Sequence, residues 1–218
     1  MERRRKTGIS LSAVIILMLA AAIVSGVAVY LWQNPELYDN KNAAISTQES
    51  KTVRESVQAR ADSVLHALKE NDMAKLAEYV HPDKGLRFSP YSNVSEKDVT
   101  IPAAQLSAAA KDGSKREWGA YDGSGEPIEL TFSEYFAKFV YPKDYLEAPE
   151  IIFNQAVQRG NSKNNIKEAF PDATSIEYYF SGFEKQYEGM DWRSLTPVFE
   201  QKDGIWYLVG LVNNQWTI

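Results

Sequence analysis

Acid–base chemistry in this chain would depend on very few side chains. The sequence holds two histidines and no cysteine, which excludes disulfides, thiol nucleophiles and cysteine-bound metal sites. His81 is the best candidate for a general acid or base, because an unperturbed histidine pKa of about 6.5 lies close to neutral pH. The competing interpretation is structural: His81 stands beside Pro82 at a predicted helix end and would bond a nearby carbonyl. His66 lies opposite an apolar stripe, which indicates a solvated side chain.

Four further polar side chains are candidates for ligand binding: Arg87, Tyr91, Asp191 and Arg193. Arg87 stands between two apolar residues in a predicted strand, so it points to the opposite face of the sheet from both. It faces water if that face is open and needs a buried carboxylate if that face is covered. Arg87 or Arg193 could bind a carboxylate or phosphate through two hydrogen bonds from its planar guanidinium group. The alternative is an Asp–Arg pair that is only structural.

The sequence contains no recognisable motif for a metal or cofactor site. Neither histidine has a second ligand at helical spacing, so we expect no metal and no cofactor. The run Asp122-Gly-Ser-Gly125 lacks the G-x-S-x-G pattern of a hydrolase elbow, the spacing of a phosphate loop and the ligands of a calcium loop. Its residues are typical of a hairpin turn, because glycine accepts positive φ readily.

The first part of the domain that must position these residues is predicted to be helical. Apolar residues recur at spacings of three and four, which predicts one stripe along a helix: Val53, Val57, Ala61, Val64, Leu65 and Leu68. Asp72 is placed to cap a second, short helix that ends at Pro82. Thr131 and Glu134 fit a capping box at the start of another helix.

The rest of the domain is predicted to be mainly strands. Residues 85–91 and 98–101 are short extended segments, and residues 118–126 form a hairpin. Strands are predicted at 151–157 and at 175–183, where alternation indicates a half-buried strand. Lys202-Asp203-Gly204 is a hairpin turn between residues 191–201 and 204–216. The last strand is apolar on both faces in its first half, which predicts a central position. The class is therefore α+β.

The amino-terminal segment predicts a membrane anchor. Residues 9–32 carry no charge, and 24 helical residues at about 1.5 Å each can span a hydrocarbon core of about 30 Å. Arg3, Arg4, Arg5 and Lys6 precede this run, which predicts a cytoplasmic amino terminus and an extracytoplasmic remainder. The alternative is a cleaved signal peptide, but a cleavable apolar region usually has about 7–15 residues.

The expected organisation is a cytoplasmic tail (1–8), a transmembrane signal anchor (9–32), a juxtamembrane linker (33–50) and one domain (51–218). The net charge is −5, and residues 1–8 carry four basic and one acidic side chain, or +3, so the remaining residues hold −8. Such a charge repels phosphate backbones, and nucleic acid is an unsuitable partner. The expected partners are the lipid bilayer and either an envelope protein or a small ligand.

The order of elements resembles that of the nuclear transport factor 2-like, or cystatin-like, superfamily, in which a long helix and short helices pack on a strongly curved antiparallel sheet. Several segments are also similar to an uncharacterised group of bacterial exported proteins: residues 81–91, 122–125, 189–193, 206–209 and 215–218. The resemblance implies a cone-like domain with a ligand or active site inside the cone, and a possible homodimer through the sheet. Scaffold subunits of secretion and conjugation machines share this architecture.

Two functions from different classes follow. The first is a membrane-tethered binding or interaction module without catalysis, which the missing nucleophile and metal motifs favour. The second is an enzyme whose cone houses His81 and an aspartate as an acid–base pair. A scaffold role in an envelope assembly is a further alternative. An interior pocket with His81, Arg87 or Asp191 would favour the ligand-binding and enzyme hypotheses. An interior filled by aromatic side chains would argue against both.

Overall fold

The computed structural model describes residues 35–217 and divides the chain into two units, residues 1–52 and 53–218. The predicted tail (1–8) and anchor (9–32) lie outside the described residues. Within residues 35–217, no helix is long and apolar enough to cross a membrane. We describe the first unit only through helix α2 (Pro35–Lys69), which begins there.

Helix α2 extends into the segment predicted as a linker, residues 33–50, where some helix near the end was expected. The helix begins at Pro35 and continues without interruption, so residues 35–50 are helical. The sequence shows no apolar stripe there, which is why periodicity did not reveal a helix. However, Pro35 stands at the first helical position, where proline is tolerated, and no glycine or proline follows it in this stretch. The compact second unit starts at Val53, close to the predicted boundary at residue 51.

The predicted helical stripe is confirmed from residue 57 onward. The side chains at its spacing are fully buried: Val57, Ala61, Val64, Leu65 and Leu68. The helix ends at Lys69, and Asn71 turns the chain with a φ of 52°. The side chain of Asp72 then accepts the Lys75 amide at the start of α3 (Met73–Ala77), as a helix cap does.

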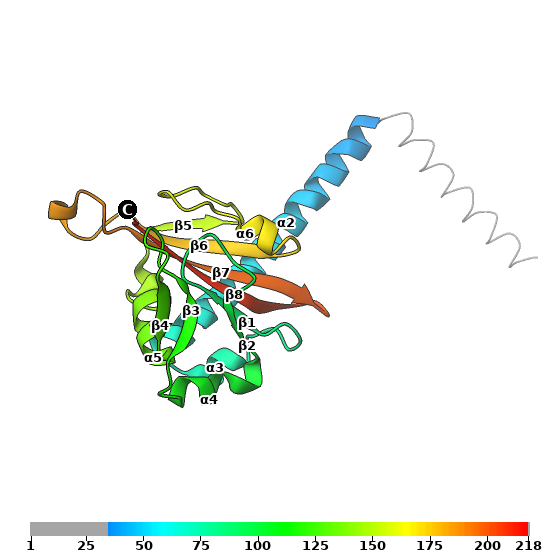
Figure 1. Ribbon diagram of the computed structural model, residues 1–218. Helices are drawn as coiled ribbons and strands as arrows, with labels where there is room; N and C mark the ends of the chain where they lie inside the picture. Colours follow the sequence, from blue (N-terminus) through cyan, green and yellow to red (C-terminus); the bar gives the residue numbers. More distant parts are fainter. Residues whose placement is uncertain (1–34, 218) are drawn as a thin grey trace, which may run out of the picture. The chain divides into compact units, whose positions relative to one another are not determined.

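The second unit is built on a six-stranded sheet with the order β2-β1-β8-β7-β6-β5. Its strands are β1 (Leu86–Ser89), β2 (Val99–Ile101), β5 (Glu150–Phe153), β6 (Thr174–Phe180), β7 (Arg193–Lys202) and β8 (Ile205–Gln215). Figure 1 shows the twist that these strands share. The expected antiparallel sheet is mixed, because β1 pairs in parallel with β8. A parallel pair needs a long connection, and the local pattern of either strand cannot show its direction relative to the other.

The long hairpin at the carboxyl end is confirmed. Strands β7 and β8 pair from Arg193 opposite Gln215 to Lys202 opposite Ile205. Asp203 and Gly204 form the turn with φ of 51° and 79°, the positive values that a two-residue hairpin turn requires. Strand β8 lies between β7 and β1, which is the central position that its apolar faces predict.

The remaining elements pack beside this sheet. A second, two-stranded sheet consists of β3 (Arg116–Ala120) and β4 (Pro127–Leu130), the predicted hairpin. Helix α4 (Leu106–Lys111) precedes it. Helix α5 (Phe132–Tyr135) follows it, with the capping box of Thr131 and Glu134 in place, and continues as a π-helical turn, Phe136–Val140. Helix α6 (Ile166–Ala169) comes before β6.

The sheet is covered on both faces. One hydrophobic cluster joins α2 and α3 to β1, β8 and α5. A second cluster contains Ile166 and Phe170, which pack with Val198 and Val209 of the central strands. Strand β6 was predicted to be half-buried, but its first five residues are all buried, including Glu177. The alternating pattern predicted an exposed Glu177, but this side chain is buried and pairs with Arg159, as described below.

Candidate functional site

The space between the helices and the sheet, where the family resemblance places a ligand, is packed with aromatic rings. Phe88 lies edge-on to Trp118, Phe132 and Tyr135, with ring centroids 5.8–6.2 Å apart. The rings of Trp118 and Tyr135 stack at 4.0 Å. All four side chains are essentially inaccessible to solvent. This region is therefore a close-packed core, and a ligand there would have to displace it.

A cleft of about 820 Å³ lies instead at the surface of the second unit. Three separate segments line it: the connection from β1 to β2 (residues 90–98), the β3–β4 hairpin (residues 117–125) and residues 161–163. Its size is that of a small-molecule site. Carboxylates, lysines, asparagines and serines contribute to its lining, which favours a ligand that forms several hydrogen bonds.

Asp122 connects the walls of this cleft. Its carboxylate accepts hydrogen bonds from the hydroxyl of Ser162 and from that of Thr217, the latter at 2.7 Å. These two hydroxyls hold the pKa of Asp122 below its ordinary value, so the side chain is ionised at neutral pH. The turn around it uses positive φ at Gly123 and Gly125, as the sequence predicts.

Asp98 is the buried carboxylate of the cleft, and the sequence analysis missed it. Its Oδ2 accepts the hydroxyl of Ser89 at 2.5 Å and the amide of Ser95 at 2.9 Å. Burial raises its pKa, and these two bonds and the charge of Arg87 act in the opposite direction. The sequence signal that could have identified Asp98 is its position immediately before β2. In the structure it contacts Ser89, the last residue of β1.

Tyr91 lines the same cleft as Asp98 and Asp122. Of the four predicted ligand-binding residues, it is the one found in this cleft. Its ring packs against Phe139 with centroids 6.0 Å apart. Burial raises the pKa of its hydroxyl, and the backbone amide of Asp122 partly opposes this effect. The hydroxyl is therefore protonated at neutral pH and available as a donor or acceptor. Together, Tyr91, Asp98 and Asp122 offer hydrogen bonds to a polar ligand.

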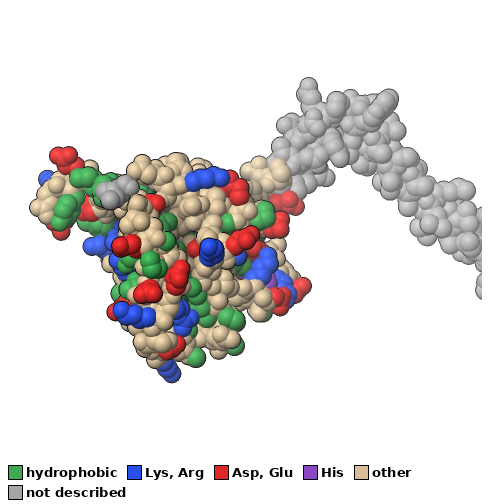
Figure 2. Space-filling model, in the orientation of Figure 1, with side chains coloured by type: hydrophobic (Ala, Val, Ile, Leu, Met, Phe, Trp, Pro, Cys, Tyr) green, Lys and Arg blue, Asp and Glu red, His purple; other side chains and the backbone are tan. Residues whose placement is uncertain are grey.

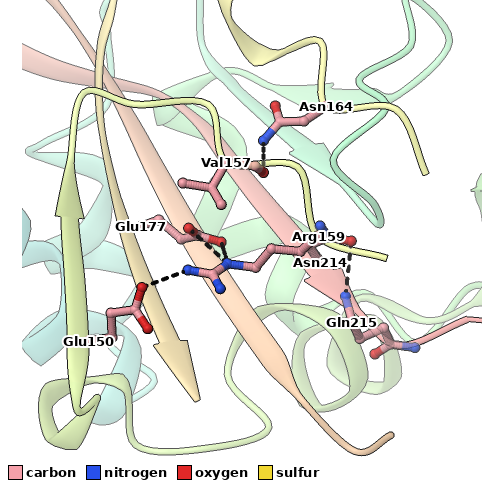
Figure 3. Close-up of polar contacts among 7 residues, drawn as sticks. All are labelled: Glu150, Val157, Arg159, Asn164, Glu177, Asn214 and Gln215. Atoms are coloured by element: carbon pink, nitrogen blue, oxygen red, sulfur yellow. Dashed lines mark hydrogen bonds and ion pairs between the residues drawn. The ribbon is translucent and has the colours of Figure 1, made fainter. Parts of the chain in front are cut away.

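One wall of the cleft belongs to a strap, residues 154–165, that the half-buried Arg159 fastens to the sheet (Figure 3). Arg159 donates from Nε to both oxygens of Glu177 at 3.0 and 3.2 Å, and from Nη2 to Glu150 at 3.0 Å. Its guanidinium carbon lies 3.4 Å from the ring centroid of Tyr179. Asn164 closes the strap on itself by donating to the carbonyl of Val157 at 2.9 Å.

His81 is buried, and its ring contacts the backbone. Its Nδ1 accepts the amides of Asp83 and Lys84 at 3.2 and 3.1 Å. Because Nδ1 is an acceptor, the ring carries its proton on Nε2. The carboxylate of Asp83 pairs with Lys202 at 2.5 Å. The Nδ1 atom of His81 is thus engaged by the following turn of backbone, and an acid–base pair of His81 with an aspartate stays a prediction.

Asp191 and Arg193 lie together at the end of the β6–β7 connection. Asp191 Oδ2 accepts the amides of Phe183 and Glu184 at 3.0 and 2.9 Å, which closes that loop on itself. Arg193 donates to the carbonyl of Lys138 at 3.0 Å. Both side chains line a pocket of about 240 Å³. The structure thus separates the predicted residues: Tyr91 is in the large cleft, this pair is elsewhere, and Arg87 is in a third place described below.

The same connection exposes large apolar side chains. Figure 2 shows apolar groups on the loop that projects at the left of the view. The exposed residues are Phe183, Tyr187 and Met190 in the loop, and Trp216 beside them in the same small pocket. Within residues 35–217, no cluster of three or more histidine, aspartate or glutamate side chains could hold a metal ion.

Comparison with known proteins gives structural neighbours only. No family model and no curated protein matches the chain. Among solved structures, it is similar to a calcium/calmodulin-dependent protein kinase II association domain from Xanthomonas campestris, at 16% identity, covering 73% of this chain and 84% of that one, with a TM-score of 0.29. A designed NTF2 protein matches at 14% identity, covering 76% and 98%, also with a TM-score of 0.29.

The described topology itself has the expected layout: a long helix, a short second helix, and a curved sheet that shares its core with them. The second unit is therefore an α+β domain with this layout.

Proposed function

We propose that this protein is a membrane-tethered, extracytoplasmic binding module without catalysis. The tether would be the uncharged run at residues 9–32, oriented by the basic residues before it. Helix α2 would then serve as the spacer, because only two residues separate its start at Pro35 from that run. The filled aromatic core argues against a ligand inside the domain, and the observation that carries the binding function is instead the surface cleft of about 820 Å³ with its hydrogen-bonding side chains.

The lining of the cleft favours a ligand rich in hydroxyl groups, such as an oligosaccharide. Carboxylates at Asp98, Glu117 and Asp122 accept hydrogen bonds from such a ligand, and asparagine amides both donate and accept. The rings of Tyr91 and Tyr121 supply aromatic surface for the apolar face of a sugar ring. A purely apolar ligand would leave these groups without partners, which is costly.

The test uses the full-length chain in a polyoxyethylene detergent and a panel of oligosaccharides, with affinity measured by calorimetry. Tyr91→Phe removes one hydroxyl but keeps the ring, and Asn161→Ala removes an exposed amide from the opposite wall. Each should weaken binding about 2- to 10-fold, the effect of one net hydrogen bond. Tyr187→Phe removes a hydroxyl outside the cleft and should leave affinity unchanged. No saturable binding across the panel, or equal losses in all three variants, would contradict the proposal.

A protein partner is a second candidate, favoured by the exposed Phe183, Tyr187 and Met190. A photo-reactive side chain introduced at Tyr187 in membranes should give a discrete cross-linked product. The same group at the exposed Ser133 should give none. Equal labelling at both positions would argue against a specific partner at this loop.

Catalysis in the cleft, with Asp98 in place of the predicted His81, is a third candidate, favoured by the raised pKa of this carboxyl. Asp98→Asn would then lower turnover of a bound ligand at least about 100-fold. His81→Ala would not. Unchanged turnover in Asp98→Asn would exclude this role.

A further inference from the structure

A second pocket lies apart from the cleft, next to α6. Its volume is about 280 Å³, and it shares no lining residue with the cleft. Its apolar lining is formed by Ala169, Phe170 and Val209, and its polar lining by Lys84, Arg87, Thr100 and Glu200. The pocket is therefore small, partly apolar and provided with two cations.

Arg87 reaches this pocket because the strand alternates. Its neighbours Leu86 and Phe88 are fully buried in the first hydrophobic cluster, so Arg87 points to the other face of β1, where α6 lies. There its guanidinium carbon lies 5.4 Å from the ring centroid of Phe170. The ring can lie there because residue 210 is glycine: a Cβ at that position would be 2.9 Å from Phe170 Cζ. The guanidinium thus rests on an aromatic platform held by the sheet.

The donors of Arg87 remain free. Arg159 is occupied by two carboxylates, and Arg193 donates to a carbonyl. By contrast, within residues 35–217 the side chain of Arg87 forms no ion pair and no hydrogen bond; its guanidinium lies over the ring of Phe170, and its charge also acts on Asp98. A half-buried cation with its N–H groups open to a pocket is poised for a charged partner.

The charge around the pocket supports the same partner. Lys84 pairs with Glu200, and both also line the pocket. Among the side chains that line the pocket, two cations and one carboxylate leave one net positive charge. Asp98, on which the charge of Arg87 also acts, lies outside this lining. The hydroxyl of Thr100 adds a further donor. A single small anion would neutralise the site.

We infer that this pocket binds one small oxyanion group, a phosphate or a carboxylate, through the guanidinium of Arg87. Two parallel N–H bonds fit the two oxygens of such a group, and stacking on Phe170 preorganises the fork. The apolar lining leaves room for a short hydrocarbon part of a carboxylic acid. The inference is independent of the oligosaccharide cleft.

The experiment titrates the full-length chain in a polyoxyethylene detergent with sodium phosphate and, separately, with sodium acetate, at constant ionic strength. Calorimetry should show saturable binding of one equivalent, and the ratio of the two affinities identifies the preferred oxyanion. Arg87→Gln should weaken binding at least about tenfold, because charge-assisted bonds are lost. Arg54→Gln is the matched control: Arg54 also stacks on a ring, that of Phe153 at 5.1 Å, but is exposed.

A third variant guards against misfolding. Glu200→Gln removes the carboxylate that opposes the anion and should tighten binding several-fold, an effect that a damaged protein would not show. The inference is overturned if neither anion binds saturably in the millimolar range. It is also overturned if Arg87→Gln binds like Arg54→Gln. Oligosaccharide binding in the cleft should be the same in all three variants.

Discussion

Replacing Arg159 by methionine should destabilise the protein far more than a typical surface substitution. The side chains of Arg159 and Glu177 are only 14% and 8% exposed, and their atoms approach to 3.0 Å. Removing the cation leaves Glu177 buried without this counter-charge, and breaking a buried pair in this way costs about 3–5 kcal/mol. Methionine keeps an unbranched chain next to the ring of Tyr179, so the loss reports mainly on charge.

The assay is urea unfolding of the full-length chain in detergent, followed by tryptophan fluorescence, as a double-mutant cycle. Replacing both Arg159 and Glu177 by methionine should restore much of the stability, because no unpaired charge remains. The expected coupling energy is about 1–3 kcal/mol. Lys75→Met is the control, since its pair with Glu78 is exposed at 48% and 61%. It should leave the unfolding midpoint unchanged.

Two results would refute this reasoning. If Arg159→Met unfolds at the same urea concentration as Lys75→Met, the cation does not hold the strap. If the double substitution costs the sum of the single ones, the two residues do not stabilise each other. When the prediction holds, loosening the strap should also weaken oligosaccharide binding, because residues 161–163 form a wall of the cleft.

Three further predictions concern stability. Gly210→Ala should cost about 1–3 kcal/mol, because the new Cβ would meet Phe170 at 2.9 Å; an unchanged urea midpoint would show that the ring moves freely. Burial raises the pKa of Asp98 above 3.8, so its contribution is full below that pH and is lost as the pH rises through the folded-state pKa. Wild-type protein should therefore lose stability relative to Asp98→Asn between pH 4 and neutral, and urea unfolding that shows a constant difference would contradict this sign. His81→Ala should cost about 1–3 kcal/mol by freeing two amides but leave ligand affinity in the cleft unchanged; weaker binding would place His81 in the site.

Local features of this fold could be predicted because they depend on neighbours in sequence. The stripe at Val57 to Leu68, the cap at Asp72, the capping box at Thr131 and the turn at Asp203-Gly204 all arise within one or two turns of backbone. Helix α2 before residue 53 was not predicted because the sequence there has no periodic apolar stripe.

The candidate sites depended on contacts that no local pattern contains. Tyr91 was predicted from the sequence as a candidate, but Asp98 was not. Asp98 becomes part of the candidate site through its contact with Ser89 and through the hairpin residues that line the same cleft, which lie farther along the chain. For Arg87, the sequence left open whether its face was wet or covered. The structure shows a third arrangement, a half-covered face with an aromatic platform and no carboxylate partner.

By itself, the sequence determined the order and type of most elements, the α+β class and the acidic charge of the domain, because propensity, capping and periodicity act over a few residues. Only the tertiary structure decided that the interior is closed by Phe88, Trp118 and Tyr135, that β1 runs parallel to β8, and that the pair of Arg159 with the buried Glu177 fastens a strap over the sheet. Such contacts join residues far apart in the chain, and packing in three dimensions alone determines which of them meet.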